Sequence, residues 1–282
     1  MNPLQFLTDA HVAIVAGKGG VGKTTVTAVL ARAAADQGLR VLVVELDGKP
    51  ALASLVGPDV GCLALTPSAA LAEYLETHGL GRVARRLATS GVIEVVATAA
   101  PGIDDIVVLG KIKQLEQSGN YDLIIVDGPA AGHAITFLMA PANLLKLMRV
   151  GPIHSQAEEV AALLTDPARS QVILVTLPET TPVNEVIETA NTLTEGAALR
   201  LGPVVVNAYD EGDDLPADSA PAGSALRAAA EFRNGRRALH RRETKRLADE
   251  LQLEQVRLPL LATPALDQQS IDELAKRLGT QQ

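Results

Sequence analysis

The residues best suited to chemistry lie at positions 17–25, in the run Gly-Lys-Gly-Gly-Val-Gly-Lys-Thr-Thr. Their spacing matches G-x-x-x-x-G-K-[ST], a pattern that binds nucleotide phosphates through backbone amides, one lysine and one hydroxyl. An apolar, strand-like run at 12–16 precedes the motif and an alanine-rich helical segment follows it, which is the context that the motif requires. We therefore predict a phosphate-binding loop here, the alternative being a glycine-rich turn without chemistry.

The side chains of this loop have separate expected roles. Lys23 should reach the β- and γ-phosphates of ATP, the Thr24 hydroxyl should ligate Mg²⁺, and Thr25 should contact the α-phosphate. Glycines let backbone amides approach the phosphate oxygens, and the following helix adds the positive end of its dipole. The other residues expected to bind the nucleotide are Gly17, Lys18, Gly19, Gly20, Val21 and Gly22.

Two carboxylates follow strand-like apolar runs. Asp47 ends the run that begins at residue 40, and Asp127 ends the run that begins at residue 121. The carboxyl ends of parallel strands form the sheet edge at which ligands bind, so both side chains should lie near the loop. We expect Asp127 to hold Mg²⁺ through a water molecule and count Asp47 with Thr24 among the metal-site residues. A helix-capping role is the alternative for Asp47.

Lys18, directly after the first glycine, is not required by the general motif. With it the loop resembles the deviant form KGGxGK[ST] of a class of dimeric ATPases. This class includes the arsenite-pump, tail-anchored-protein-targeting, septum-positioning, partition and nitrogenase-iron-protein ATPases. In that class this lysine reaches across a dimer interface to the partner's nucleotide. The resemblance implies that Lys18 and Lys23 are both catalytic; an exposed loop lysine is the alternative for Lys18.

Further stretches resemble the arsenite-pump family, and best a bacterial group of anion-transporting ATPases. Residues 45–50 resemble its first switch, in which an aspartate at the place of Asp47 orients the attacking water. The family usually has Asp-Pro-Ala there, whereas this chain has Asp47-Gly48-Lys49. Residues 101–105 resemble the family motif P-G-x-D-E, and 127–133 resemble its second switch, D-T-A-P-T-G-H. His133 is either a nucleotide sensor or a structural hydrogen-bonding residue.

The adenine side of the site is expected near the C-terminus. Asn207 follows another strand-like run, and a carboxamide can both donate to and accept from a purine edge. It resembles the adenine-contacting asparagine of the family, with a structural capping role as the alternative. The stretch 258–261, which contains Pro259, resembles the family's adenine-side loop.

The composition limits the classes of function. A chain of 282 residues that is 47% hydrophobic can bury the core of one large α/β domain. A net charge of −8 argues against nucleic acid as a partner, because phosphate contacts need clustered cations. Cys62 is the single cysteine, which excludes an internal disulfide and favours the cytoplasm. No apolar run reaches the roughly 18–20 residues that span a bilayer, so stable membrane insertion is not expected.

Alternating strand and helix patterns predict the fold class: α/β, a three-layer sandwich around a mostly parallel sheet. We expect one P-loop ATPase domain over residues 1–282, with a small helical part from about 51–90 and 137–166. The expected strands include 92–97, and the expected helices include 26–37, 224–251 and 267–278. Two helices broken at 151–152 should form either a buried pair or a pliable partner surface. Residues 208–223 should be a solvated loop, and the following basic helix should be solvated or contact an acidic partner or a nucleotide.

The resemblance implies a magnesium-dependent, ATP-hydrolysing dimeric switch that opens and closes with its nucleotide. The dimer would be a homodimer or a heterodimer with a paralogous ATPase, coupled to an unidentified protein partner or cargo. One alternative is a non-hydrolysing nucleotide-binding subunit that regulates a paralogue. Another is a partition- or septum-type positioning ATPase. A single cysteine argues against arsenite as cargo, because As(III) prefers several thiolates.

Overall fold

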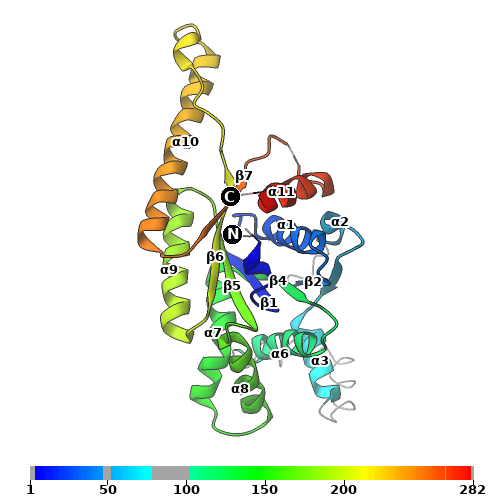
Figure 1. The fold of residues 1–282 in the computed structure, drawn as a ribbon. Coiled ribbons are helices and arrows are strands. Elements are labelled where there is room, and N and C mark those ends of the chain that lie inside the picture. The colour runs from blue at the N-terminus through cyan, green and yellow to red at the C-terminus, as the bar shows by residue number, and fades with distance from the viewer. Residues whose placement is uncertain (1–3, 47–51, 78–101, 264, 281–282) are drawn as a thin grey trace.

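The strands are almost wholly apolar because helices cover both faces of the sheet they form (Figure 1). The computed structural model describes residues 4–46, 52–77, 102–263 and 265–280. In this part of the chain, seven strands form one sheet in the order β3-β2-β4-β1-β5-β6-β7, and all neighbours are parallel. The strands are β1 (Val12–Gly17), β2 (Val41–Glu45), β3 (Gly61–Ala64), β4 (Leu123–Ala130), β5 (Ser170–Thr176), β6 (Leu201–Tyr209) and β7 (Gln255–Pro259). The predicted α/β class is confirmed.

Side chains of β1 alternate between two cores. Val12 and Ile14 belong to one hydrophobic cluster, whereas Ala13 and Val15 belong to the other, as the two-residue period of a strand requires. The second cluster is covered by α1 (Lys23–Asp36), α2 (Ala53–Val56) and α11 (Gln268–Thr280). The first is covered by α3 (Pro67–Thr77), α6 (Ile103–Gln117), α7 (Ala131–Leu147), α8 (Pro152–Thr165) and α9 (Thr180–Ala197), with α10 (Ala225–Glu250) beside α9. The sheet and its two helical layers are the expected sandwich.

The sheet order places the predicted site at its centre. Strand β1 lies between β4 and β5, so the loop after Gly17 emerges in the middle of the carboxyl edge. Asp127 of β4 is in register with Val15 of β1 and with Glu45 of β2. The switch-like carboxylate of β4 is therefore next to the glycine loop, as the sequence predicts. No helix of the described ranges is long and apolar enough to cross a membrane.

The prediction that residues 51–90 are a helical part is wrong for residues 61–64. These residues form β3, which pairs in parallel with β2 at the edge of the sheet. Its side chains are alternately half-buried and exposed, so this short edge strand lacks the continuous apolar run that marks the central strands. The strand predicted at 92–97 lies outside the described residues. The helix predicted to start at Pro67 is confirmed as α3.

The segment that follows Asp127 is strand and then helix. Strand β4 continues through Ala130 because its pairing with β1 persists to the level of Gly17, and α7 starts at once. Helix α7 passes through Pro141, and α8 starts at Pro152, the predicted break. Leu138 and Leu144 are buried, whereas Leu147 is 80% exposed, so the apolar side chains of this segment are only partly covered within the chain.

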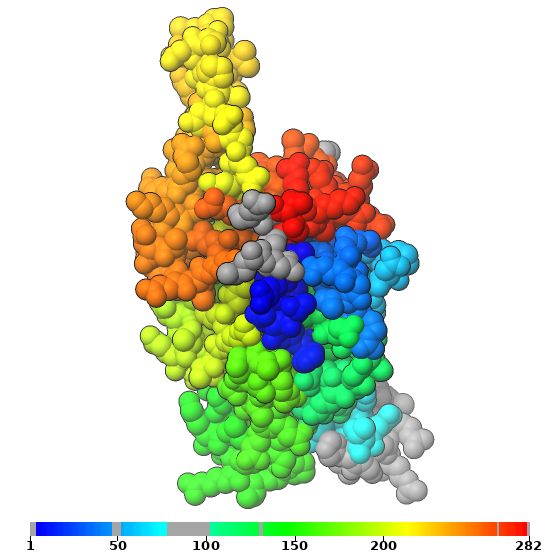
Figure 2. Space-filling view, viewed as in Figure 1, coloured from blue at the N-terminus to red at the C-terminus, as the bar shows by residue number. Residues whose placement is uncertain are grey.

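Residues 210–224 and the first half of α10 form an arm that extends away from the rest of the molecule (Figure 1), and Figure 2 shows the same projection. Residues 211–223 are mostly exposed, as predicted, but Asp210, Asp214 and Asp218 also pair with the basic helix. Arg233 donates two hydrogen bonds of 2.9 Å to Asp210, and Arg237 pairs with Asp214. Part of the basic surface of α10 is therefore neutralised within the chain.

Candidate functional site

The glycine loop forms a tight connection between β1 and α1. Gly22 is the N-cap of α1, with a φ of 87°, and it has no side chain to occupy the first amide groups of the helix. A Cβ atom on Gly22 would lie 2.3 Å from Nδ2 of Asn207, and one on Gly17 would lie 2.4 Å from the carbonyl oxygen of Val175. Both positions therefore need glycine for space. The uncapped amides at the positive end of α1 suit an anion.

Lys23 folds back over this loop. Its ammonium donates a hydrogen bond of 3.3 Å to the carbonyl oxygen of Lys18, which is five positions earlier in the chain. Val21 is buried and fixes the middle of the loop, whereas Gly19 and Gly20 are exposed. Thr24 and Thr25 are half-buried in the first turn of α1. The predicted residues 17–25 therefore form one continuous structure.

A hydroxyl and a carboxylate meet where the magnesium site is predicted. The hydroxyl of Thr24 donates a 2.8 Å hydrogen bond to Oδ2 of Asp127, and the buried hydroxyl of Thr27 donates one of 3.2 Å to Oδ1. Hard oxygen ligands of this kind fit Mg²⁺, which usually takes one or two protein oxygens along with phosphate oxygens and waters. The described residues hold no cluster of three or more His, Cys, Asp or Glu that could bind a metal alone. Thr27 was missed because its spacing gives no sign of this contact.

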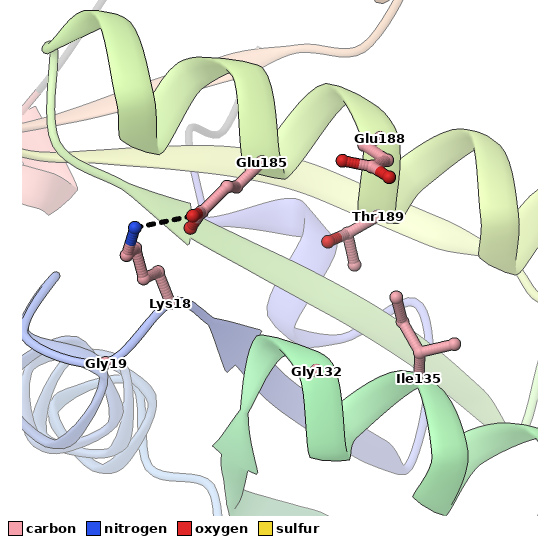
Figure 3. Close-up of a pocket in the computed structure, with 7 residues that line it drawn as sticks. All are labelled: Lys18, Gly19, Gly132, Ile135, Glu185, Glu188 and Thr189. Atoms are coloured by element: carbon pink, nitrogen blue, oxygen red, sulfur yellow. Dashed lines mark hydrogen bonds and ion pairs between the residues drawn. The ribbon is translucent and has the colours of Figure 1, made fainter.

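Lys18 is held by a residue that sequence reasoning gave no role. Its ammonium forms a 2.5 Å ion pair with Oε1 of Glu185 on α9 (Figure 3). Gly132 and Ile135 of α7 line the same pocket, whose volume is about 440 Å³. No local pattern in the sequence marks Glu185 as a site residue. Its contact with residue 18 depends on tertiary structure.

Asn207 lies beside the loop, as predicted. Its Nδ2 donates a 2.9 Å hydrogen bond to the carbonyl oxygen of Val21, so it anchors the loop in the way that a structural asparagine would. Pro259 is opposite Tyr209 in the pairing of β6 with β7. Both predicted adenine-side residues are therefore at the carboxyl edge that carries the glycine loop, and their contact with adenine stays a prediction.

Asp47 lies outside the described residues, with the whole stretch 47–51. Strand β2 ends at Glu45, whose register partner on β4 is Asp127. Glu45 is buried and accepts a 3.0 Å hydrogen bond from the backbone amide of Leu52. This carboxylate was not among the predicted site residues. The hydrogen bond between Glu45 and Leu52 joins the residues before and after the undescribed stretch 47–51.

A second buried carboxylate comes from the stretch that resembles P-G-x-D-E. Burial, followed by the nearby charge of Asp104, raises the pKa of Asp105 on α6 to about 6, while the charge of His133 on α7 acts in the opposite direction. Asp105 is only 7% exposed. The two motif stretches at 101–105 and 127–133 therefore interact electrostatically across α6 and α7.

Comparisons with known proteins agree with this geometry. A family described as Anion-transporting ATPase matches residues 10–156, which contain the glycine loop, Asp127 and His133. ATPase BagA of Mycobacterium tuberculosis is 32% identical over 98% of this chain and 94% of its own length. A protein named as an arsenical pump-driving ATPase, from Halobacterium salinarum, is 26% identical over 68% of this chain and 34% of its own. ATPase get3 of Schizosaccharomyces japonicus is 29% identical over 50% of each chain.

The family match and the nearly full-length relative both include the loop whose geometry is described above. The chain belongs to the anion-transporting ATPase family and is a P-loop ATPase.

Proposed function

We propose that this protein is a magnesium-dependent dimeric switch, in which two copies, or one copy and a paralogue, close on ATP and open after hydrolysis. The observation that supports it most is the pairing of Thr24 with Asp127 beside the uncapped start of α1. This arrangement joins an anion site to a pair of hard oxygen donors. Both are needed by an enzyme that acts on a metal-bound triphosphate.

In this proposal the loop amides and Lys23 bind the β- and γ-phosphates, and Thr24 and Asp127 hold Mg²⁺. Mg²⁺ neutralises charge on the phosphate oxygens. Asp47 orients the attacking water, and Lys18 of the facing subunit stabilises charge that develops on the phosphates. Asn207 and the loop after Pro259 contact adenine. The assignments to Lys23, Thr24, Asp127, Asn207 and Pro259 rest on the placement of these residues at one sheet edge and on the family resemblance. The roles given to Asp47 and Lys18 rest on the family resemblance alone.

The closing motion would be coupled to a protein partner or cargo in the cytoplasm. Its support is indirect: one relative is named for driving an arsenical pump, which is a task that needs a partner. The chain's one cysteine, Cys62, is exposed and on β3. A single thiol does not support arsenite as the ligand of this chain. We therefore propose no specific cargo.

The test is ATP turnover by the pure protein with Mg²⁺ or with EDTA, for wild type and for Asp47→Asn. Turnover should need Mg²⁺. Asp47→Asn should lower the turnover rate at least about a hundredfold while ATP still binds, because water would lose its orienting group. A calorimetric titration checks binding. Full turnover by Asp47→Asn would remove its catalytic role, and no turnover by wild type would favour a regulatory subunit.

A further inference from the structure

The ion pair between Lys18 and Glu185 joins the most distinctive residue of the loop to a helix that has no other role in the site. The two side chains are 41% and 35% exposed, both line the pocket, and Figure 3 shows them pointing toward each other. Asp127 is on β4, which adjoins one edge of β1, whereas α9 with Glu185 follows β5, which adjoins the other edge. Lys18 is thus directed to α9 within its own chain.

Glu185 occupies a fixed position because α9 is well anchored. Val183 and Val186 on either side of it are buried in the core, as is Ala190 one turn later. Residues 185, 188 and 189 share one helix face, and this face borders the pocket with Lys18. Lys18, in contrast, is on a loop between exposed Gly19 and the end of β1. The carboxylate is therefore on a helix that is anchored in the core, whereas the lysine is on a loop.

We propose that Glu185 is a positioning residue that holds Lys18 against α9 in the single chain and releases it when a second copy docks. This inference rests on the proposed function, in which Lys18 acts on the partner's nucleotide. An ammonium that is directed to Glu185 on its own chain must reorient to reach a phosphate of the facing subunit, so closure competes with the ion pair. A triphosphate carries more negative charge than one carboxylate and can compete for the lysine.

The ion pair between Lys18 and Glu185 can be broken at a small cost in free energy. Half-exposed ion pairs are weak, so Glu185 should hinder closure without preventing it. Its effect is to keep Lys18 away from nucleotide in the lone chain, and to make release of the lysine part of dimer formation. Loss of the carboxylate should therefore favour the closed dimer by about two- to fivefold.

The experiment compares wild type with Glu185→Gln and with Glu188→Gln, a matched control on the same helix and in the same pocket. Light scattering measures the protein concentration at which half of the chains are dimeric, with Mg²⁺ and a non-hydrolysable ATP analogue. Glu185→Gln should dimerise at about two- to fivefold lower concentration, whereas Glu188→Gln should match wild type. Equal or weaker dimerisation of Glu185→Gln would overturn the proposal.

A second pair of variants separates release of the lysine from a general loss of negative charge. In a Lys18→Ala background, Glu185→Gln should no longer change dimerisation, because there is no lysine to release. If Glu185→Gln favoured dimerisation equally in the Lys18→Ala background, the proposal would be overturned. Unfolding temperatures of all variants show whether each is folded.

If the proposed function itself is wrong, the dimerisation and turnover measurements should give a different result. It would leave wild type monomeric with nucleotide, or leave turnover unchanged by Lys18→Ala. If wild type dimerises, Lys18→Ala loses turnover and Glu185→Gln equals wild type, then only the role of Glu185 is wrong.

Discussion

At the scale of single residues, the site consists of contacts between positions far apart in the chain. Thr24 and Asp127 are 103 positions apart, yet they share a 2.8 Å hydrogen bond. Both were predictable because each follows a strong local signal: the glycine motif for one, and an apolar strand ending in a carboxylate for the other. Glu185 and Thr27 were not, since an ordinary helical glutamate or threonine has no local pattern that reveals its tertiary partner.

Asp105 gives a prediction at this scale. The pKa of its buried carboxyl is raised to about 6 in the folded chain, above the value of about 4 for an unfolded chain. Its favourable contribution to folding is therefore complete below about pH 4 and is lost as the pH rises through about 6. Asp105→Asn replaces the titrating carboxyl group, so the variant does not lose this stability as the pH rises. The variant should gain about 1–3 kcal/mol in free energy of unfolding, relative to wild type, between pH 4 and pH 7.

Urea unfolding at several pH values measures this difference, and other titrating groups cancel between the two proteins. Asp249→Asn, at an exposed position of α10, is the control. A difference between Asp105→Asn and wild type that does not change with pH would contradict the assignment of a raised pKa to Asp105.

At the scale of elements, the central strands and their helices were predictable because burial on both faces gives continuous apolar runs. β3 was missed for the opposite reason: it is a four-residue edge strand with alternating exposure. The acidic and proline residues at 210–223 correctly indicated an exposed loop, but they did not indicate that its carboxylates pair with α10. Their pairing with α10 depends on a helix that starts only at Ala225.

The arm gives a prediction at the element scale. Arg233→Ala removes both hydrogen bonds to Asp210, whose side chain is 14% exposed. The segment 211–223 should then open more often, and cleavage there by a protease should be at least about fivefold faster. Arg236→Ala is the control, because Arg236 pairs with Glu179 of another segment at 4.0 Å. Equal cleavage of both variants would show that the bonds to Asp210 do not hold the arm.

At the scale of the whole molecule, the loop, Asp127, Asn207 and Pro259 meet at one edge of the sheet because the seven strands are parallel. The sequence could predict this edge from strand ends alone. It could not predict that the ammonium of Lys18 pairs with Glu185 on α9 of the same chain. A role for Lys18 in another subunit therefore requires movement, and the dimer is the state in which that role would be realised.

The central claim is that each site combines Lys23 of one chain with Lys18 of another, and mixing two inactive variants tests it most directly. Lys18→Ala and Lys23→Ala should each lack turnover alone. A mixed dimer has one complete site, in which the Lys18→Ala chain contributes Lys23 and the Lys23→Ala chain contributes Lys18. An equal mixture should therefore recover about a quarter of wild-type ATP turnover. A mixture that stays inactive, although labelled subunits show that mixed dimers form, would contradict the account.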